Sequence, residues 1–331
     1  MARDRRGQRG VALAVVAIGL TVMLGFCVLA VELGHLGVST SEVQIVADSA
    51  ATAAARSLLR NKLTGGLEAP LAAAATVAAE NTVDGQPLSR ARVVVTEGVF
   101  SPATGSFTAT SFSPNAARAV ARATLPSGLA AILGQRPSRV RRTAIAAYGG
   151  TCTAQTALPI ALGSCLFRRY QRRQNCSRLP SLANVPDAAN NSCWTSLEPG
   201  SADASQASSF LPSECCSGRS CGGGQPVQLQ TGSQINGLTG QDDVLLGIIR
   251  NCYDQGIREF VVPVINCGSN PGGGNGCGQS QVVGFATVRV DSVTPSGPNE
   301  GMNLTTLCSD DDPGGGIGCS NYGRQTVALV R

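Results

Sequence analysis

The chain has 331 residues, a formal charge of +5 and 43% hydrophobic residues. This length and apolar content are enough for two small folded regions besides a membrane segment. Aromatic residues make up only 4% of the chain, so we expect cores of small and β-branched side chains. The basic residues, all arginine apart from Lys62, are not interleaved with stacking aromatic residues, so composition argues against a nucleic-acid partner.

The first 31 residues have the pattern of a membrane anchor. Residues 1–10 hold four arginines against one aspartate, and residues 11–31 carry no charge. An uncharged helix of 21 residues would span about 31 Å, which is the thickness of a bilayer's hydrocarbon core. The basic flank should stay in the cytoplasm, which places residues 32–331 outside it. We therefore predict a cytoplasmic tail, a single transmembrane helix and a membrane-lipid partner.

A cleaved signal peptide is the alternative for this segment. Val28, Leu29 and Ala30 are compact enough for signal peptidase, but the apolar run is longer than the usual 7–15-residue core of a signal peptide. The anchor is therefore favoured. We expect Cys27 to be a buried, unpaired thiol within this apolar segment.

The helical pattern continues beyond the membrane segment to about residue 60. Leu36, Val43, Ala47 and Ala50 belong to a series of apolar residues spaced by three and four. Residues 47–55 are mostly Ala, Ser or Thr, and such small side chains let another backbone approach closely. Two alternatives stay open: this face binds a partner helix, or it covers the protein's own sheet.

The same helix carries a family resemblance. Glu32 lies two residues before Gly34, and an alanine-rich stretch with a glutamine and an aspartate follows over residues 43–55. This arrangement resembles the N-terminal module of TadE/TadG-like Flp pilus-assembly proteins. The matching positions are Gln44, Ala47, Asp48, Ala50, Ala51 and Ala53 to Ala55, whereas Val43, Ile45, Val46, Ser49 and Thr52 depart from the pattern.

The resemblance implies a location in the bacterial inner membrane and a role in adhesion, surface colonisation or secretion. Pilin-like members are cleaved after a glycine and carry a glutamate five residues later; here Gly10 is present but Val15 takes the glutamate position. The permanently anchored TadG-like subtype therefore fits better. The stalk, residues 32–60, would contact other pilus-assembly or pilin-like proteins, and we predict its interaction residues to be Glu32, Gly34, Gln44, Ala47, Asp48, Ala50, Ala51 and Ala54.

Residues 61–150 predict a second helix and a small antiparallel sheet that packs on it. The helix should run from Leu67 to Glu80 and end at Asn81, before an Asp84-Gly85 turn. Short β-prone segments follow at Arg92–Thr96, Ser106–Ser111, Ala117–Ala123 and Arg141–Ala147. The predicted fold class is α+β, with a mainly β, cysteine-rich region over residues 151–331.

That last region holds twelve cysteines, at positions Cys152, Cys165, Cys176, Cys193, Cys215, Cys216, Cys221, Cys252, Cys267, Cys277, Cys308 and Cys319. An even number outside the cytoplasm predicts disulfides. Zinc is disfavoured because the chain lacks a Cys-x-x-Cys knuckle and has a single histidine, His35. The Gly-rich loops between Cys267 and Cys277, and between Cys308 and Cys319, are candidates for local closure.

Three further segments of this region have clear patterns. Asp242–Arg250 predicts an amphipathic helix with acidic residues at its start, where the helix dipole favours them. Glu259–Ile265 and Gln281–Val290 predict core strands. The acidic run at residues 310–312 is better explained as a solvated turn than as a calcium site, because it has no EF-hand spacing.

The sequence predicts no catalytic residue, cofactor or metal site. Ser-His-Asp or Cys-His chemistry needs an imidazole beside the nucleophile, and His35 lies at the membrane boundary. The densest basic cluster is Arg168, Arg169, Arg172, Arg173 and Arg178. A solvated loop is favoured for this cluster over contact with an anionic envelope polymer or lipid headgroups.

Two functions remain open at this point. The first is a membrane-anchored structural or assembly component of a Tad/Flp-type pilus or related secretion system, without enzymatic activity. The alternative is an extracytoplasmic envelope-binding module unrelated to pili.

Overall fold

A computed structural model describes residues 5–87, 92–128, 131, 134, 136–173, 176–186, 191–199, 207–216, 224–237, 243–267, 278–297, 300–310 and 316–330. The chain divides into two compact units. Unit 1 comprises Met1–Ala54, Ala69–Thr96 and Arg118–Ile145, and unit 2 comprises Ala55–Glu68, Glu97–Ala117 and Ala146–Arg331.

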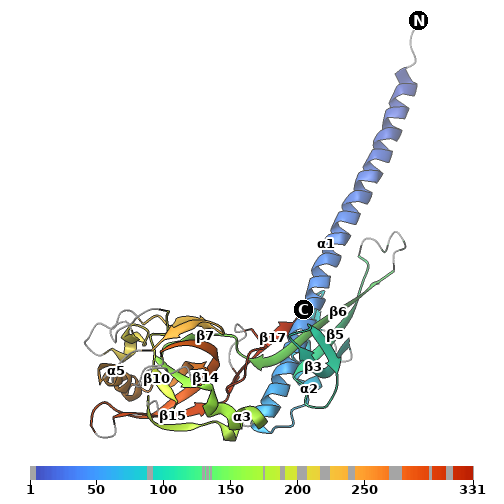
Figure 1. Ribbon diagram of the computed structural model, residues 1–331. Coiled ribbons are helices and arrows are strands. Elements are labelled where there is room, and N and C mark those ends of the chain that lie inside the picture. The colour runs from blue at the N-terminus through green and yellow to red at the C-terminus, as the bar shows by residue number, and fades with distance from the viewer. Residues whose placement is uncertain are drawn as a thin grey trace. The chain divides into compact units, whose positions relative to one another are not determined.

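The N-terminal segment is one continuous helix, α1 (Arg5–Thr64), of 60 residues (Figure 1). It joins the predicted apolar span and the predicted stalk without a break, and it ends four residues beyond the expected end. Within the described chain it is the one helix long and apolar enough to cross a membrane. Its side chains from residues 13 to 27 are exposed, as a lipid-facing segment requires.

A short helix and a hairpin follow α1. Helix α2 (Pro70–Glu80) begins with proline, whose fixed φ suits the first turn, and three of its alanines are buried. Strands β1 (Thr82–Val83) and β2 (Gln86–Pro87) pair antiparallel. Asp84 and Gly85 connect them with φ values of 53° and 69°. Two positive φ values are typical of a type I′ turn, which confirms the predicted turn.

The predicted strands of residues 92–147 all form and belong to one six-stranded sheet. The strand order is β16-β17-β6-β5-β3-β4. The members are β3 (Val93–Ser101), β4 (Ser106–Ala109), β5 (Ala116–Leu125), β6 (Ser138–Gly150), β16 (Ser309–Asp310) and β17 (Arg324–Val330). Strands β16 and β17, near the end of the chain, thus join a sheet whose other four strands precede residue 151.

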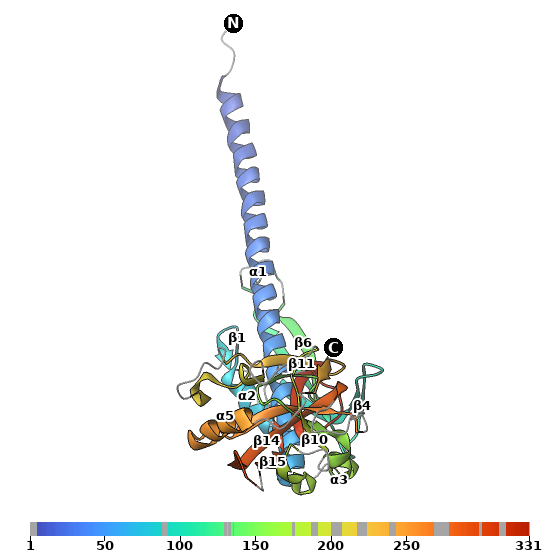
Figure 2. The same cartoon turned by 60° about the vertical axis from the view of Figure 1, so that its left-hand side comes forward.

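A second, seven-stranded sheet has the order β10-β8-β13-β14-β15-β9, with β12 also paired to β14. Three of its strands, β10, β14 and β15, are labelled in Figure 2. Its pairs are antiparallel except for β13 with β8. Its strands are β8 (Ile160–Gly163), β9 (Ser181–Val185), β10 (Ser192–Trp194), β12 (Gln234–Asn236), β13 (Glu259–Ile265), β14 (Gln279–Thr294) and β15 (Gly301–Leu307). Strands β7 (Thr153–Thr156) and β11 (Val227–Gln230) form a separate pair.

The helices of this region are short. Those with described bounds are α3 (Arg168–Arg173), α5 (Asp243–Asp254) and the single-turn 3-10 segments η3 (Ser164–Phe167), η4 (Cys176–Arg178) and η6 (Ser213–Cys215). The predicted amphipathic helix is confirmed as α5, which buries Leu245, Leu246 and Ile249. The two predicted core strands are confirmed as β13 and β14.

The core of the second sheet differs from the expected one. Trp194, Tyr170, Phe167 and Phe285 are among the largest fully buried side chains of the chain. The expectation of cores without large rings is therefore wrong for this region. The few aromatic residues are concentrated here, and this concentration is invisible in an average composition.

The disulfide prediction is confirmed, but the proposed local closures are wrong. The bridges are Cys152–Cys319, Cys165–Cys267, Cys176–Cys308 and Cys215–Cys252. Cys193 and Cys216 are disulfide-bonded as well. Cys267 and Cys308 therefore pair with residues more than 100 positions away. Cys221 and Cys277 lie outside the described residues, as do Asp311 and Asp312.

Among the cysteines that the structure describes, Cys27 is the free one, as expected, but its side chain is exposed on α1 and not buried within the protein. The twelve other cysteines all follow residue 150. Cross-linking is thus a property of the C-terminal region alone.

Candidate functional site on the helical stalk

The eight predicted interaction residues all lie on α1, but they differ in exposure. Ala47, Ala50, Ala51 and Ala54 have no exposed surface. Their burial within the chain is what the internal-packing alternative requires. Gly34 is exposed, and Glu32, Gln44 and Asp48 are half-buried.

Gln44 and Asp48 interact with each other. The Gln44 Nε2 atom donates a hydrogen bond of 2.8 Å to Asp48 Oδ1, one helical turn further on. The Asp48 backbone carbonyl also accepts a bond of 2.9 Å from the Thr52 hydroxyl. The two polar residues that mark the resemblance therefore form one local pair on the helix, and such a pair stabilises the helix by a few tenths of a kcal/mol, roughly 0.2–0.5.

Three other polar residues of α1 hold loops of the same unit. Glu32 Oε1 accepts a hydrogen bond of 3.1 Å from the Gly128 backbone amide. His35 Nε2 lies 2.8 Å from Asp84 Oδ1, and Glu42 Oε2 accepts a bond of 2.7 Å from the Asp84 amide. We call these five residues the collar. It attaches the β1–β2 turn and the β5–β6 connection to the helix just beyond the apolar run.

The collar is rich in negative charge around one histidine. The hydrogen bond to Asp84 is the main reason that the pKa of His35 is raised above its usual 6.5, with Glu32 and Glu42 contributing by charge. Because His35 follows the apolar run by four residues, its ring is outside the expected membrane segment. Its protonated form therefore holds the β1–β2 turn more strongly than the neutral form does.

The buried residues Ala47, Ala50, Ala51 and Ala54 form the alanine face of the stalk helix. An exposed stripe runs along the opposite side of this helix. Gly34, Val38, Ser41 and Ile45 are all exposed, Val38 at 61% and Ile45 at 54%. Their spacing of four, three and four residues places them on one helical face. A side chain at Gly34 or Gly37 would meet no atom within 4 Å. We call Gly34, Val38, Ser41 and Ile45 the outer stripe.

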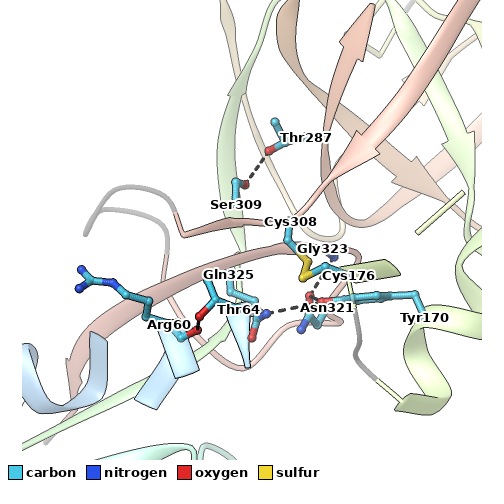
Figure 3. Close-up of a disulfide and its surroundings, with 10 residues drawn as sticks. All are labelled: Arg60, Thr64, Tyr170, Cys176, Thr287, Cys308, Ser309, Asn321, Gly323 and Gln325. Carbon is cyan, nitrogen blue, oxygen red and sulfur yellow. Dashed lines mark hydrogen bonds between the residues drawn. A yellow bond between two sulfur atoms is a disulfide. The ribbon is translucent and has the colours of Figure 1, made fainter. Parts of the chain in front are cut away.

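The basic cluster of the cysteine-rich region lies on and beside α3. Arg168, Arg169 and Arg172 are exposed, while Tyr170 between them is fully buried. The Tyr170 hydroxyl donates a bond of 3.1 Å to Asn321 Oδ1, which also accepts from the Gly323 amide at 2.9 Å. Figure 3 shows this network beside the Cys176–Cys308 disulfide. The arginines are therefore carried by a fixed helix and not by a loop.

Burial has the largest effect on the pKa of the Tyr170 hydroxyl. It raises the pKa of Tyr170 to about 12, against a smaller lowering effect of the bonds with Asn321 and Gln325. The hydroxyl thus stays protonated and keeps its role as a donor at physiological pH. Among the residues that the structure describes, no group of three or more His, Cys, Asp or Glu side chains could hold a metal ion.

Two protein-family models match α1 and the residues that follow it. The model of the Flp pilus-assembly TadE/G-like family matches residues 10–57, and the model of the Tad-like Flp pilus-assembly family matches residues 47–146. The chain carries Tad-type pilus-assembly domains. We call the matched residues 10–146 the Tad module. Searches of curated proteins and of solved structures found no match to the chain.

The Tad module confirms the family that the N-terminal pattern resembles. It contains the apolar run, the outer stripe, the whole collar and the buried alanines, and it extends into β6. The matches end before the cysteine-rich region, residues 151–331. Sequence reasoning missed the collar and the outer stripe. The stripe's spacing was visible in the sequence, but the collar depends on contacts between residues 42 to 96 positions apart.

Proposed function

We propose that the chain is a single-pass, membrane-anchored structural or assembly component of a Tad-type pilus system, of the permanently anchored TadG-like kind. The observation that carries this proposal is the continuity of α1, in which an apolar run of membrane length passes without interruption into the stalk, both within the Tad module. Residues 11–31 would lie in the bacterial inner membrane. Residues 1–10 would face the cytoplasm, and residues 32–331 would lie outside it.

The outer stripe is the proposed contact with another pilus-assembly protein. The buried alanines are already covered by the chain, so they are not available to a partner. The stripe offers two exposed β-branched side chains, Val38 and Ile45, together with a glycine and a serine, directly beyond the membrane run. Small residues let two helices approach closely, and the apolar residues between them gain from being covered. The proposed partner is thus an apolar helix of a second Tad protein.

Two separate glycine-to-leucine variants, one on the outer stripe and one as a control, test this contact. Gly34→Leu adds volume on the stripe without meeting any neighbour in its own chain, so the variant should fold normally. We expect cells carrying it to show few or no surface pili by electron microscopy, and crosslinks from residue 38 to a second protein to disappear. Gly247→Leu, on α5, is the matched control because its Cβ also meets nothing within 4 Å. Normal piliation with Gly34→Leu would refute the proposed contact.

Topology is tested separately. Alkaline phosphatase fused after Arg331 should be active, because the C-terminus is proposed to lie outside the cytoplasm. The mature protein should retain residues 11–31 and resist extraction from membranes by alkaline carbonate. A mature N-terminus at Val31 would show a cleaved signal and overturn the anchor. An adjacent secretion ATPase and prepilin peptidase in the genome would favour the pilus function over the alternative.

A second candidate function is an envelope-binding module, and the observation in its favour is the α3 cluster. Arg168, Arg169 and Arg172 are exposed on a helix held by a buried tyrosine and a nearby disulfide. A fixed array of guanidinium groups suits an anionic envelope polymer. Charge reversal of these arginines should release the protein's outer region from isolated cell wall at low salt. Unchanged wall binding would eliminate this candidate. We assign no catalytic role to the chain.

A further inference from the structure

The β5–β6 hairpin has an unbalanced charge. Residues 118–145 contain six arginines and not a single aspartate or glutamate. Arg136, Arg139, Arg141 and Arg142 are exposed on the β6 side of the hairpin. Within the described part of the chain, none of the ion pairs involves these four side chains. Their charge is therefore not neutralised by an ion pair with any residue that the structure describes.

The far end of this hairpin lies at the membrane end of the stalk. The Gly128 amide donates to Glu32, which directly follows the last residue of the apolar run. The Ser127 hydroxyl donates a bond of 2.8 Å to the Arg136 carbonyl, so Arg136 lies at the level of Gly128. Figure 1 shows β5 and β6 rising along α1 toward its N-terminal half. All these residues belong to unit 1.

The geometry sets an order of distance from the membrane. A strand advances about 3.3 Å per residue, so Arg139 lies about 10 Å and Arg141 about 17 Å beyond Arg136 along β6. The headgroup layer is about 5–8 Å thick on each side of the hydrocarbon core. The attraction of a charge to an anionic surface decays over a Debye length of about 8 Å at physiological salt. Arg136 and Arg139 are therefore the residues within reach of headgroups.

We propose that the β5–β6 hairpin binds the anionic phospholipid headgroups of the bilayer that holds α1, chiefly through Arg136 and Arg139. This inference rests on the proposed anchoring by α1. The hydrogen bond between Gly128 and Glu32 fixes the hairpin at the height of the headgroups. The result is a second point of attachment that restricts tilting of unit 1 against the membrane.

The experiment uses the full chain in nanodiscs of phosphatidylcholine, alone or mixed with phosphatidylglycerol. A fluorophore is attached to Ser138→Cys in a Cys27→Ala background, and headgroup-spin-labelled lipid quenches it. Quenching should be several-fold stronger in the anionic discs, and it should weaken as salt is raised. The double variant Arg136→Gln/Arg139→Gln should lose this dependence, whereas Arg136→Lys/Arg139→Lys should keep most of it, since charge and not shape is required.

Arg168→Gln/Arg169→Gln on α3 is the matched control, because it removes the same charge from exposed positions of unit 2. It should leave the quenching unchanged. Arg142→Gln should have the smallest effect of the β6 substitutions. Equal quenching in neutral and anionic discs, with the chain retained in both, would overturn the hairpin proposal alone. Loss of the chain from the discs would instead refute anchoring by α1, and with it both proposals.

Discussion

The Tad module and the cysteine-rich region are stabilised in different ways. The buried residues of α1 and α2 in the module include Ala47, Ala50, Ala54, Ala74 and Ala78, and the module contains one cysteine, which is free. Alanine buries little area, so these helices depend on close contact between backbones. The cysteine-rich region buries large side chains such as Trp194 and Phe285, and its described cysteines are disulfide-bonded.

This difference teaches where each region is vulnerable. A contact between closely packed backbones has no room for added volume, because protein interiors are close-packed. A core of large rings joined by long-range bridges loses most when a bridge is removed, because the unfolded chain then regains its freedom. Added volume should therefore damage the Tad module, and removed bridges should damage the cysteine-rich region.

The largest effect is expected from removal of a disulfide. Cys152–Cys319 joins residues 167 positions apart. We expect Cys152→Ala/Cys319→Ala to lower the free energy of unfolding of the cysteine-rich region by about 2–5 kcal/mol. The single tryptophan, Trp194, is 1% exposed in this core, so its fluorescence during urea unfolding in detergent reports this region. Cys27→Ala should leave the transition unchanged. An unaltered urea midpoint for the double variant would contradict the claim that the cysteine-rich region depends on its long-range disulfides.

The next effect is expected from added volume on the alanine face. Ala50 has no exposed surface, so Ala50→Leu should overpack the surroundings of this residue and cost about 1–3 kcal/mol. Hydrogen exchange of α1 residues 43–58 measures this cost directly. Gly34→Leu provides the comparison, because it adds more volume at an open position and should leave exchange unchanged. Equal exchange in both variants, with new crosslinks from residue 50 to another chain, would favour the partner-helix alternative for this face.

The helices and several strands could be predicted because their signals are local. The uncharged run and the alanine series predicted α1, the acidic start predicted α5, and Asp84-Gly85 predicted its turn. Strand pairing could not be predicted in the same way. Strand β17 joins the sheet of β3 to β6 from the far end of the chain, and no local pattern marks that return. Cys267 and Cys308 lie beside Gly-rich loops that favoured local pairs, yet they bridge 102 and 132 residues.

The candidate site was predictable only where the family pattern is sequential. Glu32, Gln44 and Asp48 lie on one helix, so their spacing identified them. The partner of Glu32 depends on a tertiary contact: Gly128 is 96 residues away, and its role is to present a backbone amide, which every residue type except proline offers. The β6 arginines were not singled out because their meaning comes from the height at which the hairpin meets α1.

A smaller effect is expected for Tyr170, in the cysteine-rich region. Tyr170→Phe removes a buried hydroxyl that bonds to Asn321, so we expect a loss of about 0.5–1.5 kcal/mol. Because the folded pKa is raised from 10.0 to about 12, the hydroxyl stabilises the fold fully below pH 10 and loses this contribution as pH rises through 12. The tyrosinate absorbance of the wild type should therefore include a step near pH 12 that Tyr170→Phe removes. The pKa of Tyr148 is also raised to about 12, so Tyr148 must be replaced by phenylalanine in both proteins. An equal step near pH 12 in the Tyr170→Phe variant would contradict its assignment to Tyr170.

The smallest effect is expected in the collar of the Tad module. The hydrogen bond to Asp84, with the nearby charges of Glu32 and Glu42, raises the folded pKa of His35 above 6.5. A raised pKa means that the ion pair's contribution is fully present below about pH 6.5 and is lost as pH rises through the folded value. The Asp84 amide, which donates to Glu42, should then exchange faster at high pH after correction for intrinsic exchange. His35→Gln keeps a donor but cannot titrate, so its corrected exchange should be flat across this range. If wild type and variant show the same profile, the His35–Asp84 pair does not control attachment of the β1–β2 turn, and the Glu42 bond alone holds it to the stalk.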